Sequence, residues 1–148
     1  MKLRTNDPWM PADAYGKSLK GLSVNLLVQS IDSELVFQTD VLGATVVYSD
    51  PDIAVCRGYD AEWMLHADHT YSDHPLKGSL TDDIPRGIGA EIRLYGCDPD
   101  IAEAAARTLK MDVLAGAMDK PHGLREVYLI SPSGYLWVPS IALTEDVE

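Results

Sequence analysis

Apolar and polar residues alternate along two separate stretches of the chain, over residues 22–29 and over residues 88–95. A period of two is typical of a β-strand with one buried face. The apolar faces consist of Leu22, Val24, Leu26 and Val28 in the first stretch and of Ile88, Ala90, Ile92 and Leu94 in the second. Each stretch is therefore predicted to be a half-buried strand whose other face points away from the core.

A helix is expected after each of these strands. Ser30 is suited to cap the first helix, over residues 31–42, and Gly43 to end it. Asp98 and Pro99 are residue types that begin a helix, and the apolar spacing that follows them is helical. Three β-rich runs follow each helix: residues 44–49, 53–59 and 61–66 after the first, and 112–117, 125–130 and 135–141 after the second. The chain thus predicts a strand–helix–strand–strand–strand unit that occurs twice.

This repeat predicts an α+β fold. Two pseudo-symmetric βαβββ units, over about residues 22–66 and 88–141, are expected to have curved mixed sheets that enclose a central cleft. Residues 22–148 form a single domain in this interpretation, and the turn-rich residues 67–87 form a linker and a candidate mobile lid. Residues 1–21 are interpreted as an N-terminal extension that packs through Trp9.

Charge and composition narrow the possible partners. The 148 residues include 12 basic and 23 acidic side chains, which give a formal net charge of −11. Such a surface repels phosphate backbones, so nucleic acid is not an expected partner. No apolar run has the length of a membrane span, so no membrane association is expected. Two cysteines form no disulfide framework, which fits the reducing cytoplasm.

Three short stretches carry a resemblance to a known superfamily. They are Ser30–Gly43 with its Leu-Gly end, Lys120–Tyr128 with its proline, glycine and arginine, and the turn in Ser131–Trp137. In their order and spacing they resemble the vicinal oxygen chelate superfamily, which includes glyoxalase I, extradiol dioxygenases and bleomycin-resistance proteins. The resemblance covers roughly residues 22–141. It implies the two-unit fold and a homodimer, because such proteins often pair their units between chains.

The resemblance also implies where a metal would bind. Catalytic members hold a divalent metal with His, Glu or Gln from the opening and closing strands of each unit. In this chain those positions fall on Ser23, Glu91 and Val138, and on Met64 or His66. Valine cannot bind a metal, and serine is a poor ligand for zinc, nickel or iron. No bound metal or other cofactor is therefore predicted, and a divalent metal held by Glu91 and His66 is the alternative.

Candidate site residues come from the open strand faces and from aromatic side chains. The predicted ligand contacts are Asn25, Trp63, His66, Glu91, Arg93 and Tyr128. His66 and Glu91 are also the candidate catalytic residues, as acid/base groups. The alternative for Glu91 is an ion pair with Arg93, two residues further along the same face.

Other residues allow a functional and a structural interpretation. His66, His69 and His74, with their neighbouring aspartates, are either a relocated metal site or a strand end that continues into a solvated loop. Arg125 is either a clamp for a substrate carboxylate or an outward surface side chain. The aromatic residues could form a binding wall or pack in the core; they are Trp63, Tyr95, Tyr128, Tyr135 and Trp137.

The leading hypothesis is a glyoxalase-like protein that binds a small organic molecule in its cleft without metal catalysis. The sequence leaves open whether the protein is an enzyme. If it is one, the resemblance implies a metal-dependent lyase, isomerase or dioxygenase that uses Glu91 and His66. A non-catalytic dimeric scaffold with an empty cleft is the third hypothesis.

Overall fold

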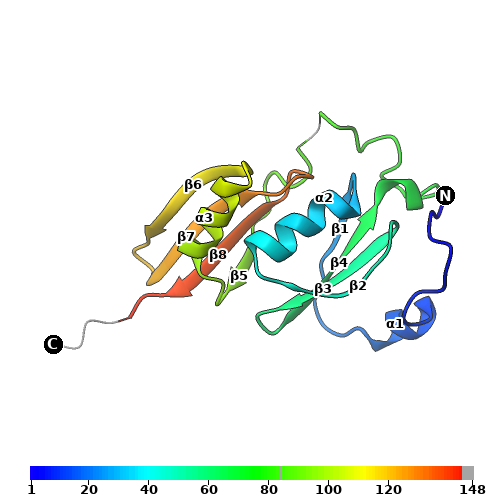
Figure 1. The fold of residues 1–148 in the computed structure, drawn as a ribbon, viewed down its shortest axis with the longest axis horizontal. Helices are drawn as coiled ribbons and strands as arrows, with labels where there is room; N and C mark the ends of the chain where they lie inside the picture. Colours follow the sequence, from blue (N-terminus) through cyan, green and yellow to red (C-terminus); the bar gives the residue numbers. More distant parts are fainter. Residues whose placement is uncertain (84, 145–148) are drawn as a thin grey trace.

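The predicted repeat is present in the computed structural model, which describes residues 1–83 and 85–144. Two four-stranded mixed sheets, each with its own helix, lie side by side along the long axis of the molecule (Figure 1). Residue 84 of the predicted linker and the predicted domain end at residue 148 lie outside the described residues. The α+β fold of two βαβββ units is therefore confirmed.

The first unit has the strand order β1-β4-β3-β2. Its elements are β1 (Asn25–Val28), α2 (Ile31–Val36), a π-helical turn η1 (Phe37–Val41), β2 (Thr45–Ser49), β3 (Ile53–Gly58) and β4 (Ala61–Ala67). β1 pairs with β4 in parallel, and the other pairs are antiparallel.

The second unit repeats this arrangement with the order β5-β8-β7-β6. Its elements are β5 (Ile92–Tyr95), α3 (Pro99–Thr108), β6 (Asp112–Asp119), β7 (Leu124–Ile130) and β8 (Leu136–Ala142). Here β5 pairs with β8 in parallel. The side chain of Asp98 caps α3 by accepting hydrogen bonds from the N–H groups of Asp100 and Ile101.

The opening strands are shorter than predicted. Both begin late: Leu22 is 96% exposed and Ile88 is 80% exposed, and the strands themselves start only at Asn25 and at Ile92. The first helix also differs, because its second half is a π-helical turn in which Leu42 N–H donates to Phe37 O. Gly43 ends the helix as predicted, with a positive φ of 72°.

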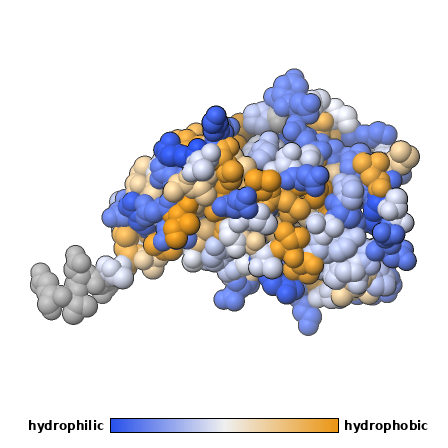
Figure 2. All heavy atoms as spheres, in the orientation of Figure 1, coloured by the Kyte–Doolittle hydropathy of each residue, from blue (hydrophilic) through white to orange (hydrophobic). Residues whose placement is uncertain are grey.

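The alternation in the sequence corresponds to the two faces of each sheet. One face of each sheet packs against the helices in a core shared by both units; on β1 it contributes Leu26 and Val28, and on β5 it contributes Leu94. At the junction of the units the Trp137 ring lies 5.5 Å from the Trp63 ring and 6.4 Å from the Phe37 ring, between centroids. Apolar side chains also gather on the surface near this junction, in the middle of the face shown in Figure 2.

A buried carboxylate joins the units beside this core. Glu34 of α2 is fully buried, and its Oε2 accepts from Ser133 N–H at 3.1 Å, in the turn between β7 and β8. Burial raises the pKa of Glu34 above its ordinary value, although hydrogen bonds from Ser131, Ser133 and Gln38 oppose the shift. The folded protein therefore holds a proton on Glu34 more tightly than the unfolded chain does.

This pKa difference predicts how Glu34→Gln changes the pH dependence of stability. Because the folded pKa is the higher one, Glu34 stabilises the fold below the unfolded pKa and loses this contribution as pH rises through the folded pKa. The free energy of unfolding of Glu34→Gln should therefore increase relative to that of the wild type as pH rises above about 4, the usual range of an exposed glutamate. Urea titrations at a series of pH values measure the difference.

Glu103→Gln is the matched control, because it should show the opposite trend. Hydrogen bonds from Ala117 N–H and from Arg107 hold the pKa of Glu103 below its ordinary value. Glu103 thus stabilises the fold at the higher pH and loses this contribution as pH falls. A constant difference between Glu34→Gln and the wild type would contradict the expected shift at Glu34.

The N-terminal extension packs on the outer face of the first sheet. It contains α1 (Ala12–Ser18), none of whose residues is buried. The Trp9 ring stacks on the Tyr48 ring of β2, with centroids 4.7 Å apart.

Arg86 holds the linker against the first unit. Its guanidinium donates to both carboxylate oxygens of Asp68 and to Leu27 O. Within the described residues, no helix is long and apolar enough to cross a membrane.

Candidate functional site

A cavity of about 230 Å³ lies between the N-terminal extension and the first sheet. Its floor comes from β3 and β4, and its roof from residues 4–19 of the extension. The lining is mainly apolar: Pro8, Trp9, Met10, Leu19, Ile53, Val55 and Met64, with Arg4, Tyr15 and His66 as the ionisable side chains. This site is concave and has few polar groups, which is the usual character of a small-molecule pocket.

His66 is the polar group on the floor of this cavity. Its Nδ1 lies 2.6 Å from Asn25 Oδ1, on the neighbouring strand β1. The amide nitrogen of Asn25 in turn donates to Tyr71 Oη at 3.2 Å. Burial lowers the pKa of His66 below its ordinary value, and the positive charge of Arg4 adds to this while Asp50 opposes it. Burial thus favours the neutral imidazole of His66, which Asn25 holds in place.

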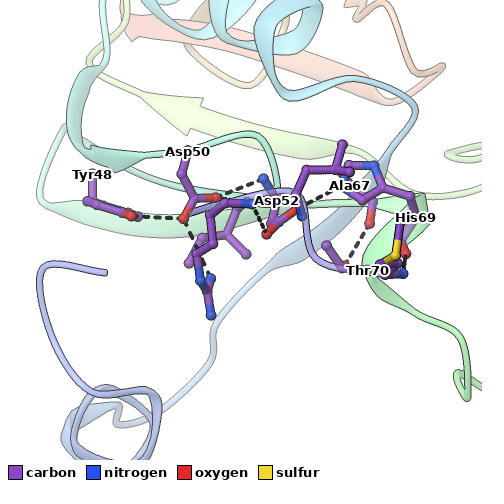
Figure 3. A network of polar contacts seen from close by, with 10 residues as sticks. Tyr48, Asp50, Asp52, Ala67, His69 and Thr70 are labelled. Atoms are coloured by element: carbon purple, nitrogen blue, oxygen red, sulfur yellow. Dashed lines mark hydrogen bonds and ion pairs between the residues drawn. The ribbon is translucent and has the colours of Figure 1, made fainter. Parts of the chain in front are cut away.

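The roof is anchored on the turn between β2 and β3 (Figure 3). Asp52 is fully buried, and its carboxylate accepts from Leu3 N–H at 2.7 Å and from Arg4 N–H at 3.1 Å. His69 Nε2 lies 2.8 Å from the same carboxylate. Burial raises the pKa of Asp52, but these hydrogen bonds outweigh it and hold the pKa below its ordinary value. A charged, buried carboxylate therefore binds the start of the chain.

Two further contacts hold the roof over the sheet. Arg4 pairs with Asp50 at 3.5 Å, and Asp50 also accepts from Tyr48 Oη at 2.8 Å (Figure 3). On the far side of the cavity, Tyr15 Oη donates to Glu62 Oε2 at 3.1 Å. Burial and the Glu62 carboxylate raise the pKa of Tyr15 to about 12, so this phenol is neutral.

A second polar cluster lies on the outer face of the second sheet. Its centre is Glu126 of β7, which is fully buried although it lies on this outer face. His122 Nε2 lies 2.6 Å from Glu126 Oε1, Tyr128 Oη donates to Oε2 at 2.9 Å, and Arg93 Nη2 donates to Oε1. Burial raises the pKa of Glu126, but these three partners outweigh it and hold the pKa below its ordinary value.

The predicted ligand contacts therefore fall into two groups. Asn25 and His66 are hydrogen-bonded at the first sheet. Glu91, Arg93 and Tyr128 gather around Glu126 at the second sheet, where Arg93 Nη1 donates to Glu91 Oε2 at 2.8 Å. Among the described residues no hydrogen bond or ion pair joins the two groups, and no residue of the second unit lines the cavity.

Trp63 lies elsewhere than predicted. It is 4% exposed, on the helix-facing side of β4, and its Nε1 donates to Gln38 Oε1 at 2.9 Å. Trp63 and His66 are three positions apart in one strand, so a regular strand places them on opposite faces. This corrects its predicted place among the ligand contacts. Trp137 packs beside it in the core, and Tyr135 Oη donates to Leu27 O.

Arg125 also points away from the open face. Its guanidinium donates to Asp100 of α3 and to Asp119 of β6, at 2.8 Å in each case. This position fits the structural interpretation of Arg125 as an outward surface side chain. The clamp for a substrate carboxylate would require these two acidic partners to be displaced.

The side chains at the superfamily's metal positions do not fit a metal site. Ser23 precedes β1 and is exposed, Val138 is buried and apolar, and Glu91 pairs with Arg93. The three neighbouring histidines have separate partners, since His69 contacts Asp52 and His74 Nδ1 accepts from Leu76 N–H. Within residues 1–83 and 85–144 no three His, Cys, Asp or Glu side chains converge on a point.

The residues predicted from the sequence did not include Asp52 or Glu126, and the packing expected of Trp9 was not predicted to cover a cavity. A signal for Glu126 exists in the alternation of β7, where Val127 and Leu129 face the core and Glu126 and Tyr128 share the other face. No comparable signal exists for Asp52, which has the residue type of an ordinary turn. Its partners are the N–H groups of residues about fifty positions away, and a sequence pattern does not reveal such contacts.

Comparisons with known proteins bear on the fold. No family model matches the sequence, and no curated protein matches it. Among solved structures, a glyoxalase/bleomycin resistance protein/dioxygenase from Nocardioides is 18% identical with a TM-score of 0.60, over 92% of this chain and 97% of that chain. A glyoxalase-related enzyme from Fulvimarina pelagi is 13% identical with a TM-score of 0.64, over 82% of this chain and 87% of that chain.

A lactoylglutathione lyase from Agrobacterium tumefaciens is also similar, at 16% identity and a TM-score of 0.60, over 82% of this chain and 92% of that chain. Identities this low establish a shared fold and leave the chemistry open, because unrelated activities occur on one fold. The chain therefore has the fold of the glyoxalase/bleomycin resistance protein/dioxygenase proteins, as its sequence resemblance implied.

Proposed function

We propose that this protein binds a small organic molecule in the cavity between its N-terminal extension and its first sheet. The observation that carries the proposal is the cavity itself, which combines an apolar lining with His66 as a hydrogen-bonding group on its floor. Apolar walls supply affinity by removing ligand surface from water, and a single fixed polar group supplies orientation.

The side chains that could serve as metal ligands support binding without metal catalysis. His66 lies at the cavity, whereas Glu91 lies on the second sheet and pairs with Arg93. Two protein ligands that belong to different units cannot enclose a cation, and catalytic zinc sites use three protein ligands. The metal-dependent lyase or dioxygenase that uses Glu91 and His66 therefore has little support from the arrangement of this chain.

Val55→Phe tests the proposal by filling the cavity. Val55 lies on β3 among the lining residues, so a phenylalanine ring at this position occupies the space that a ligand would take. A thermal-shift screen with small ring compounds is expected to find ligands that raise the Tm of the wild type. The same ligands should lose at least about tenfold in affinity for Val55→Phe, measured by calorimetric titration.

Leu114→Phe is the matched control, because it adds the same ring at an exposed position of β6, far from the cavity lining. It should bind ligands as the wild type does. Equal binding by Val55→Phe and the wild type would place the ligand elsewhere and contradict the proposal. The absence of any stabilising ligand would instead favour the non-catalytic scaffold.

A further inference from the structure

His66 lines the cavity and has one ring nitrogen that no described residue contacts. Asn25 donates through its amide nitrogen to Tyr71, so its Oδ1 is the atom that faces His66 Nδ1. An oxygen acceptor at 2.6 Å requires the hydrogen to be on Nδ1. In the neutral ring the other nitrogen, Nε2, then carries a lone pair and no hydrogen. No described residue donates to Nε2, so a ligand can.

The charged groups around the cavity are already paired with one another. Arg4 pairs with Asp50, and the carboxylate of Asp50 also accepts from the N–H groups of Asp52 and Ile53. Glu62 is held by Arg57 and Tyr15. A charged ligand would give up part of its hydration without gaining an unpaired counter-ion, which is unfavourable. The cavity therefore favours a neutral ligand.

Its size limits the ligand as well. An apolar cavity of about 150 Å³ accommodates benzene. The volume here is about 230 Å³, which leaves room for one ring and a small substituent. The rings of Trp9 and Tyr15 in the roof offer flat apolar surfaces to such a ligand.

We propose that this cavity selects a neutral, single-ring ligand that donates one hydrogen bond to His66 Nε2, such as a phenol or a cyclic alcohol. This inference rests on the proposed function and names the ligand class of the same site. It also makes His66 the residue that determines specificity, since a ligand that covers this acceptor without donating to it removes its contact with water and gives no hydrogen bond in return.

Three para-substituted toluenes test the inference: p-cresol donates a hydrogen bond, 4-methylanisole has the same ring with its oxygen methylated, and 4-methylbenzoate is an anion. Their affinities for the intact wild-type chain are measured by calorimetric titration. We expect p-cresol to bind about tenfold more tightly than 4-methylanisole, and 4-methylbenzoate to bind most weakly.

Two variants assign this preference to His66. In His66→Phe the ratio between p-cresol and 4-methylanisole should fall to about one, because the acceptor is replaced by an apolar ring. His66→Gln, which keeps an acceptor oxygen, should retain part of the preference. Circular dichroism and the Tm of each variant establish that it is folded.

The outcomes separate the two claims. If the ring probes bind the wild type and Val55→Phe abolishes their binding, but p-cresol has no advantage or 4-methylbenzoate binds best, the inference is wrong and the proposed function stands. A preference for p-cresol that persists in His66→Phe also contradicts the inference. If none of the probes binds and the wider screen finds no ligand, the proposed function fails and the inference fails with it.

Discussion

Replacing Trp137 with alanine is expected to lower the free energy of unfolding by about 3–5 kcal/mol. The Trp137 side chain is 1% exposed and contacts Phe37 and Trp63, which belong to the other unit. Its removal leaves a cavity where the two units meet, and such a site cannot collapse without moving a helix or a sheet. Urea denaturation followed by circular dichroism measures the loss.

Trp137→Phe is the informative control for this prediction. The indole Nε1 of Trp137 is buried and has no hydrogen-bond partner among the described residues, so a phenyl ring loses packing area but no hydrogen bond. The cost of Trp137→Phe should be less than half that of Trp137→Ala. If Trp137→Ala costs less than about 1 kcal/mol, the two units do not share one core as the structure has it.

Asp52→Ala is expected to release the N-terminal extension from the first sheet. It removes the acceptor of Leu3 N–H and Arg4 N–H, and hydrogen bonds to a charged group contribute about 1.5–3 kcal/mol each. Local opening of the extension then becomes more frequent. Trypsin should cleave after Lys17 and Lys20 at least about tenfold faster than in the wild type, since each 1.4 kcal/mol of opening free energy corresponds to a factor of about ten.

Two variants control for charge and for shape. Asp7→Ala removes the same charge from an exposed position of the extension and should leave the cleavage rate unchanged. Asp52→Asn keeps one acceptor oxygen without the charge, so its cleavage rate should be intermediate. An unchanged rate in Asp52→Ala would show that stacking of Trp9 on Tyr48 and the contact between Tyr15 and Glu62 are enough to hold the roof.

The structure also changes which segment is the candidate lid. The linker over residues 67–87 was the candidate lid in the sequence, yet Arg86 fixes it through Asp68 and Leu27. The extension covers the cavity with no buried residue in α1, and it joins β1 through Gly21, whose φ is 67° and whose surroundings are open. The extension lines the cavity, whereas no described residue of the linker does, so the extension replaces the linker as the candidate lid.

Most of the fold was determined by local patterns in the sequence. The alternation of β1 and β5, the cap at Asp98 and the glycine at position 43 each act within a few residues, so they can be recognised without knowing the partner strand. The same alternation places His66 and Trp63 on opposite faces of β4, and applying it strictly would have kept Trp63 in the core.

The site was decided by the tertiary structure. The N-terminal extension covers the outer face of the first sheet because of a few long-range contacts. Examples are those of Asp52 with Leu3 and Arg4, and of Tyr15 with Glu62. These contacts join residues about fifty positions apart. Each is a single hydrogen bond to a carboxylate, and such a bond produces no repeating pattern in the sequence. Alternation determines that a strand has two faces, whereas only long-range packing determines what lies against the outer one.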